Sequence, residues 1–148
     1  MSKNLLSVLL ADNDEEEWLF FKDAFEKLKI KTQVEFVHDG VELMKYLTQP
    51  DIILPDILFL DLNIPKKAEH ECLVEIKNND NLKNLIVAIY STSASEEDIE
   101  DTFVKGANIY IKKPHDADSL KKIISYVMSL NWQYHTTGLN RENFLLRL

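Results

Sequence analysis

The sequence predicts an α/β fold in which a parallel β-sheet carries helices on both faces, a three-layer α/β/α sandwich. Three observations support this prediction. Strand-like and helix-like segments alternate five times, which is the pattern of a parallel sheet with crossover helices. Several of the strand-like segments are apolar almost throughout, as in strands buried on both faces. The 148 residues, 45% of them hydrophobic, suit one domain with a single core.

Five segments have the composition of strands, because each is an apolar or alternating run that stops at a polar, glycine or proline residue. They are LLSVLLA (5–11), QVEFVHDG (33–40), DILFLD (56–61), LIVAIYS (85–91) and NIYIKKP (108–114).

The helices are indicated by apolar residues three and four positions apart. In the first helix these are Trp18, Phe21, Phe25 and Leu28, and Asn13 or Asp14 could cap it. Later helices are expected around Val41–Leu47, from 69 to 79, from Ser95 as cap to Gly106 as terminator, and around Leu120–Val127.

Composition excludes several classes of protein. The net charge of −8 argues against binding nucleic acid through a general basic surface. The single cysteine, Cys72, permits no internal disulfide and fits a reducing cytoplasm. The amino-terminal segment turns acidic too soon for a signal peptide, and no run reaches the roughly 20 apolar residues that cross a bilayer. We therefore expect a soluble cytoplasmic protein without a membrane partner.

Polar residues stand where four of the predicted strands end, at the edge where such sheets bind ligands. They are Asp12-Asn13-Asp14, Asp61 with Asn63, Ser91-Thr92-Ser93, and Lys112-Lys113-Pro114. Carboxylate and carbonyl oxygens are ligands that Mg²⁺ prefers, and a carboxylate can attack a phosphoryl group. Each of these residues, taken alone, also has an ordinary structural role, as a helix cap, a loop hydroxyl or a solvated lysine. Their joint placement at one edge favours phosphoryl chemistry.

The motifs LLADND, PDILFLDLNIPKK, AIYSTSASEED and GANIYIKKP, in this order, resemble the receiver domain of two-component response regulators over residues 5 to 130. The resemblance implies a flavodoxin-like sheet of order 2-1-3-4-5. It divides the chain into a receiver domain, 1–130, and a carboxyl-terminal extension, 131–148, without a separate output domain. The implied activity is signal transduction in a phosphorelay, not enzymatic turnover.

The resemblance also implies roles for individual residues. Asp61 would accept the phosphoryl group, Ser91 would contact it, and Lys113 would pair with it. Mg²⁺ would be held by Asp12, Asn13 and Asp61 together with the backbone carbonyl of Asn63. Ser91 and Tyr110 would be the switch residues, with Tyr110 changing rotamer on activation.

Two positions depart from the family pattern. Asn13 stands where the second metal-binding acid is expected, which predicts weaker Mg²⁺ affinity unless Asp14 compensates. Glu69 stands where such receivers carry glycine, and a residue with a Cβ adopts positive φ less readily. The nucleophile, the hydroxyl and the lysine are all retained.

Partners and alternatives follow from the same resemblance. DLNIPKK and STSASEED are similar to small regulators of phytochrome-type and other hybrid histidine kinases, so a histidine kinase or phosphotransfer protein is the expected partner. The apolar residues of the extension, from Trp132 to Leu148, either fold back on the domain or form a homodimer or partner contact. The main alternative function is a pseudo-receiver that binds proteins without being phosphorylated. A phosphohydrolase would need a second aspartate where Asn63 stands, and an FMN-binding protein would need a phosphate loop in place of DNDEEE.

Overall fold

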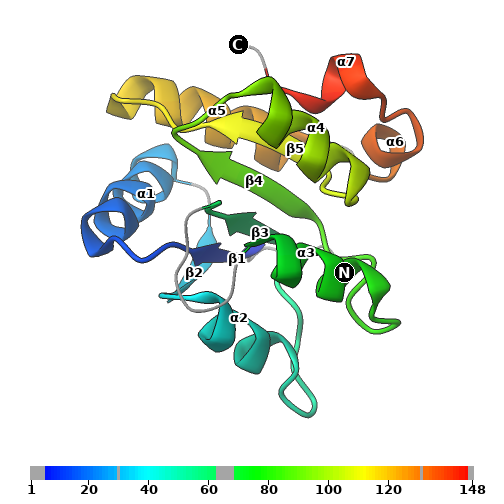
Figure 1. Cartoon of the computed structure of the whole chain (residues 1–148). Helices are drawn as coiled ribbons and strands as arrows, with labels where there is room; N and C mark the ends of the chain where they lie inside the picture. Colours follow the sequence, from blue (N-terminus) through cyan, green and yellow to red (C-terminus); the bar gives the residue numbers. More distant parts are fainter. Residues whose placement is uncertain (1–5, 30, 63–68, 131, 147–148) are drawn as a thin grey trace.

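A computed structural model describes residues 6–29, 31–62, 69–130 and 132–146. Five parallel strands form one sheet in the order β2-β1-β3-β4-β5. The strands are β1 (Leu6–Ala11), β2 (Thr32–Val37), β3 (Ile57–Leu60), β4 (Val87–Ser91) and β5 (Ile109–Lys112). The predicted sheet and its strand order are confirmed (Figure 1).

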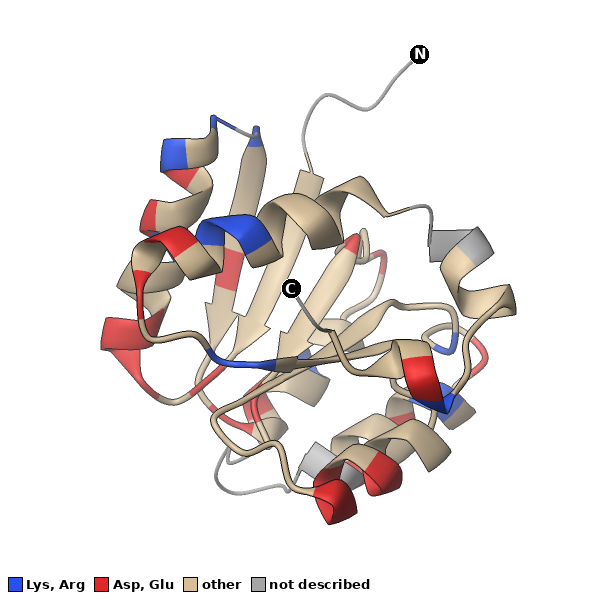
Figure 2. Ribbon diagram, turned by 90° about the horizontal axis from the view of Figure 1, so that it is seen from above, with Lys and Arg blue, Asp and Glu red and all other residues tan. Residues whose placement is uncertain are grey.

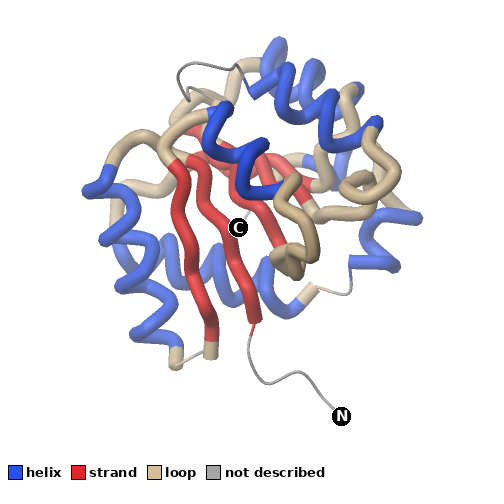
Figure 3. The backbone as a smooth tube through the Cα atoms, turned by 90° about the horizontal axis from the view of Figure 1, so that it is seen from below, coloured by secondary structure: helices blue, strands red, loops and turns tan. Residues whose placement is uncertain are grey.

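Helices cover both faces of the sheet, as Figure 3 shows. They are α1 (Glu15–Leu28), α2 (Gly40–Leu47), α3 (Glu69–Asn78), α4 (Glu96–Val104), α5 (Ala117–Ser129), α6 (Trp132–Thr137) and α7 (Arg141–Phe144). Helices α1 and α5 pack on one face, and α2, α3 and α4 pack on the other. The last two helices, orange and red in Figure 1, lie beyond β5.

The period-two alternation of the strands builds two cores on opposite faces of the sheet. Leu9 and Leu58 point to the core beneath α2, α3 and α4, whereas Leu10 and Phe59 point to the core beneath α1 and α5. All four side chains are fully buried. The central strands are therefore rigidly held, and the residues that follow them start from fixed positions.

The elements lie where the sequence predicts them, with three differences in extent. β2 ends at Val37 and not at Gly40, because the Asp39 side chain caps α2, which begins at Gly40. β4 begins at Val87 and not at Leu85, because the Leu85 N–H donates to the carbonyl of Leu82 in a turn, at 2.9 Å, and so stands outside the ladder. The extension contains α6 and α7, which its irregular apolar pattern did not predict. Among the described residues, no helix is long and apolar enough to span a membrane.

Candidate functional site

The carboxyl ends of β1, β3, β4 and β5 bring together four of the predicted site residues. The Asp61 N–H donates to the carbonyl of Ala11, at 3.0 Å, and the Lys113 N–H donates to the carbonyl of Ser91, at 2.7 Å. These backbone bonds tie the first residue after one strand to the end of its neighbour. Asp12, Asp61, Ser91 and Lys113 therefore stand at one edge of the sheet, as the parallel topology predicts.

Lys113 lies between the two aspartates. Its Nζ is 2.8 Å from Asp12 Oδ2 and 3.6 Å from Asp61 Oδ2. Both aspartates are buried, with 1% of Asp12 and 5% of Asp61 exposed. Burial acts to lower the pKa of Lys113, but the hydrogen bond to Asp12 and the charges of Asp61, Asp12 and Glu17 outweigh it and raise that pKa. The lysine therefore stays charged and neutralises part of a buried acidic pair.

The remaining oxygens of Asp12 are also used. Its Oδ1 accepts from the backbone N–H of Asp14, at 3.0 Å, and its carbonyl accepts from the indole N–H of Trp18, at 2.7 Å. The carboxylate is thus fixed from both sides, since its other oxygen bonds Lys113.

The residues next to Asp12 do not extend the buried acidic pair. Asp14 caps α1, because its Oδ1 accepts from the Glu16 N–H at 3.0 Å, and its side chain is exposed. Asn13 is exposed as well. Of the two caps that the sequence left open, the structure uses Asp14. Asn63 and residues 64–68 lie outside the described residues, whereas Glu69, at the position where the family carries glycine, is the first residue of α3.

Ser91 and Tyr110 are connected through Ser93. Ser91 is fully buried, and its Oγ accepts from the Ser93 N–H at 3.1 Å. The hydroxyl of Tyr110, also fully buried, donates to the Ser93 carbonyl at 2.7 Å. The two predicted switch residues therefore meet at the first turn of the β4–α4 loop.

Three residues near the site were not assigned to it from the sequence. Glu17 accepts from the Tyr90 hydroxyl at 3.2 Å, and burial raises the pKa of Glu17 against the opposing charge of Lys113. The Lys113 ammonium lies 5.3 Å from the centre of the Tyr90 ring. Trp18 bonds Asp12 and stacks on Phe36, with ring centres 4.9 Å apart. The sequence predicts only that Glu17 and Trp18 lie on the first helix and that Tyr90 lies in a strand. Those positions indicate packing and not a place in the site.

The carboxylates of Asp12 and Asp61 suit a hard cation that takes its remaining ligands from water and phosphate. In the part of the chain that the structure describes, no three His, Cys, Asp or Glu side chains are grouped to hold a metal ion by themselves. Asp12 and Asp61 nevertheless place two carboxylates around a single ammonium. Mg²⁺ typically takes one or two carboxylates, several waters and a phosphate oxygen, so the residues fit such an ion. Acidic first turns of α1 and α4, red in Figure 2, add negative charge at this edge.

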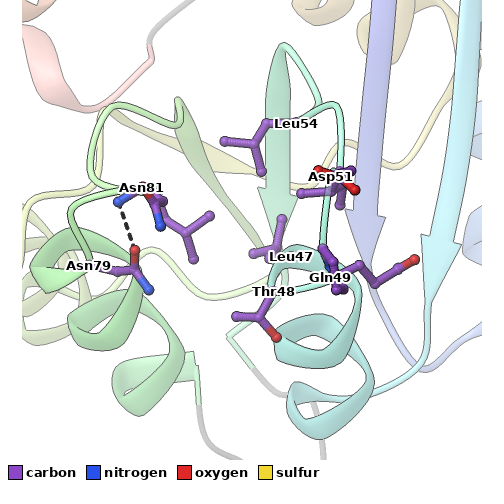
Figure 4. A pocket seen from close by; sticks show the side chains of 10 residues that line it. Leu47, Thr48, Gln49, Asp51, Leu54, Asn79 and Asn81 are labelled. Atoms are coloured by element: carbon purple, nitrogen blue, oxygen red, sulfur yellow. Dashed lines mark hydrogen bonds between the residues drawn. The ribbon is translucent and has the colours of Figure 1, made fainter.

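A separate pocket lies at the opposite edge of the sheet. It has a volume of about 460 Å³ and lies between the α2–β3 and α3–β4 connections (Figure 4). It is lined by Leu47, Thr48, Gln49, Pro50, Asp51, Ile52, Leu54, Asn79, Asn81 and Leu82. None of these residues belongs to the cluster around Lys113.

The parallel sheet of order 2-1-3-4-5, with helices on both faces, is the fold of a receiver domain. Residues 8–125 match the response regulator receiver domain family. The chain belongs to this family.

Named relatives agree with this assignment. Response regulator Rcp1 of Synechocystis is 28% identical over 126 residues, which are 82% of this chain and 86% of that protein. The phosphorylated cyanobacterial phytochrome response regulator RcpA superposes with a TM-score of 0.76 and 32% identity, over 82% of this chain and 90% of the other. The Mn²⁺-bound form of Rcp1 gives 0.75 and 27%, over 84% and 93%. The chain is thus related to phytochrome response regulators.

Proposed function

We propose that the protein is a response regulator that accepts a phosphoryl group on Asp61 and thereby switches a protein-interaction surface. The observation that carries this proposal is the position of Lys113, whose Nζ lies between Asp12 and Asp61 at the end of buried strands. Because the strand before Asp61 is buried, the Asp61 carboxylate is presented to an incoming phosphoryl group in a fixed orientation. The adjacent ammonium lowers the cost of bringing further negative charge to the site.

The transfer uses groups that the chain supplies. An Asp61 oxygen attacks phosphorus, an O–P bond forms, the bond from phosphorus to the donor histidine nitrogen breaks, and that nitrogen keeps the electron pair. Lys113 exchanges part of its contact with Asp12 for a phosphoryl oxygen. The Ser91 hydroxyl, whose oxygen already accepts from Ser93, donates its hydrogen to another. These two contacts neutralise and orient the new group.

The implied metal is Mg²⁺, with Asp12 and Asp61 as its carboxylate ligands. Asn13 and the carbonyl of Asn63 complete the set that we propose from the family resemblance. A bound divalent ion supplies charge neutralisation for the phosphoryl oxygens. The Mn²⁺-bound form of Rcp1 supports a divalent ion in a relative of this chain.

The proposed phosphoryl donor is a histidine kinase or a phosphotransfer protein. The names of the relatives, which include a phytochrome response regulator, support a kinase of the phytochrome type. We assign the receiver to residues 1–130 and treat 131–148 as an extension of it.

Incubation with acetyl phosphate and Mg²⁺, followed by intact mass, tests the proposal. Wild-type protein should gain one phosphoryl mass that mild base removes, and Asp61→Asn should gain none. Asp56→Asn is the matched control, because the Asp56 carboxylate bonds the Ser7 N–H, at 2.7 Å, and precedes β3 instead of following it. Asp56→Asn should label like wild type, and equal labelling of Asp61→Asn would refute the proposal.

A pseudo-receiver is the second candidate, and the exposed Asn13 beside a capping Asp14 is the feature that favours it. A pseudo-receiver would gain no mass with any phosphoryl donor. The same labelling experiment therefore separates the two functions.

A further inference from the structure

The carboxyl-terminal tail, residues 132–146, docks on α4 and β5 of its own chain. Leu145 forms a parallel bridge with Tyr110, and the Leu146 N–H donates to the Tyr110 carbonyl at 2.9 Å. The tail thus lies beside β5 and pairs with it through one isolated bridge. Because this edge of the sheet ends at β5, the tail occupies backbone groups that no other strand of the sheet pairs.

Phe144 is the centre of this contact. It is fully buried, and its ring packs edge-on against Phe103 of α4, at 5.3 Å, and Tyr110 of β5, at 6.2 Å. Asn140 caps α7 in a capping box, which fixes the turn that carries Phe144. The tail is therefore an ordered part of the core beneath α4.

On the solvent-exposed side of the same contact, ion pairs join the tail to α4. The guanidinium of Arg141 bonds Glu100 at 2.6 Å and Glu96 at 3.1 Å. Helix α4 carries three acidic residues in its first turn, so a basic tail residue is suited to it. This ion pair is exposed and can be broken without disturbing a core.

Tyr110 is held between the tail and the site. Its hydroxyl bonds the Ser93 carbonyl, and its ring packs against Phe144. Turning the ring away from Ser93 would break that bond and move the ring toward the tail. The docked tail therefore opposes this rotation, and Ser93 in turn donates to the Ser91 hydroxyl oxygen.

We propose that Phe144 and the tail act as an intramolecular clamp that keeps Tyr110 turned toward Ser93. With Ser93 held there, the Ser91 oxygen accepts from the Ser93 N–H and its hydrogen is left to donate to a phosphoryl oxygen, so the clamp favours the phosphorylated state. This inference rests on the proposed function. Phe144 is a positioning residue, because it acts on the site through Tyr110 and Ser93. The coupling is reciprocal, so a phosphoryl group on Asp61 tightens the tail by the factor by which the tail tightens phosphoryl binding.

The direction of this coupling can be measured as an affinity. Beryllium fluoride with Mg²⁺, a phosphoryl-like ligand of a carboxylate, is titrated into the full chain by calorimetry. Phe144→Ala should weaken its binding at least about fivefold, the lower end of typical coupling between sites. Arg141→Glu, which leaves the core intact, should weaken it by a smaller factor. Lys22→Glu makes the same charge change on an exposed position of α1 and should have no effect.

A double-mutant cycle separates a clamp from a general loss of stability. Tyr110→Phe keeps the ring against Phe144 but removes the hydroxyl that bonds Ser93. In that background Phe144→Ala should no longer change beryllium fluoride affinity. If the weakening persists in the Tyr110→Phe background, it does not pass through Tyr110 and the clamp is refuted.

Hydrogen exchange of residues 140–146 gives the reciprocal measurement. Beryllium fluoride should slow exchange of these amides in wild-type protein and not in Asp61→Asn. Faster exchange on binding would show that the tail opposes the phosphorylated state and would overturn the clamp. Protection that depends on protein concentration would show that a second copy of the chain covers this surface, which would also overturn an intramolecular clamp. Wild-type protein that neither binds the ligand nor gains phosphoryl mass would refute the proposed function itself. Normal binding with equal affinity in the Phe144 and Arg141 variants would refute the clamp alone.

Discussion

Two partly buried lysines at opposite edges of the sheet have opposite pKa shifts. At the carboxyl edge, Lys113 bonds Asp12 and faces Asp61, and its pKa is raised. At the other edge, Lys77 of α3 donates to two neutral oxygens, the Leu85 carbonyl at 2.9 Å and Asn108 Oδ1 at 3.0 Å. Burial lowers the pKa of Lys77 to about 8.

The opposite pKa shifts of the two lysines distinguish a candidate functional site from a structural contact. Both ammonium groups lose water, and desolvation alone disfavours their charged forms. Of these two lysines, only Lys113 regains that free energy from carboxylates, so only Lys113 is held in its charged form, beside the proposed phosphoacceptor Asp61. A buried lysine is therefore informative about function when its partners are known, and not from its burial alone.

The largest effect is expected from removing the charge of Lys113. Lys113→Met leaves Asp12 and Asp61 buried without a cation, and breaking such a pair costs about 3 kcal/mol of unfolding free energy at pH 7 without Mg²⁺. Urea unfolding measures it, and added Mg²⁺ should restore part of the loss. Lys112→Met removes the exposed neighbouring lysine and should change little. Equal stability of the two variants would contradict the assigned role of Lys113.

A smaller effect is expected at Lys77, with a characteristic pH dependence. Because its pKa of about 8 in the folded protein lies below the usual lysine pKa of 10.5, the unfolded state binds more protons between these values. Unfolding free energy should therefore rise with pH across this window, by on the order of 1 kcal/mol after allowance for its partial exposure. Urea unfolding at several pH values measures the rise.

Two variants sharpen the measurement at Lys77. Lys77→Met should lose the rise, since no ammonium remains to titrate. Asn108→Asp gives Lys77 a carboxylate like that of Lys113 and should also flatten the curve, by raising the lysine pKa. An unchanged rise in both variants would assign it to another group.

A further effect of similar size concerns charge added beside Asp12. Asn13→Asp should tighten Mg²⁺ binding by about 1 kcal/mol, the value of one screened carboxylate. The fluorescence of Trp18 is a suitable signal, because its indole N–H bonds the Asp12 carbonyl. Asp14→Asn removes a capping carboxylate instead and provides a comparison. Unchanged affinity in Asn13→Asp would mean that position 13 lies outside the metal shell or, if Asp14→Asn weakens binding, that Asp14 already supplies this charge.

The strands and the residues that follow them were predictable because local pattern determines both. Apolar runs ending in Asp12, Asp61 and Lys113 identify strand ends, and parallel strands must bring those ends together. The caps Asp14 and Ser95 follow from short-range hydrogen bonding, which sequence spacing expresses directly. The roles of individual site residues came from the family resemblance and remain proposals.

The tail and the environment of Lys77 were not predictable because tertiary contacts create them. Phe144 is buried by α4 and β5, which lie more than 30 positions earlier in the chain. Lys77 meets Asn108, and Asn108 in turn donates to Thr136 at 3.3 Å, so three distant segments define one polar contact. A lysine near the end of a helix is otherwise expected to be solvated, as most lysines are.

The strand pairing of Leu145 and Leu146 also bears on solubility. An unpaired strand at the border of a sheet presents N–H and C=O groups that can template pairing with another molecule, and natural proteins blunt such borders with charge or a covering segment. Here β2 carries Glu35 at one border, whereas β5 is covered by its own chain at Tyr110. Shortening the protein before Leu145 would uncover that border and favour aggregation through β5.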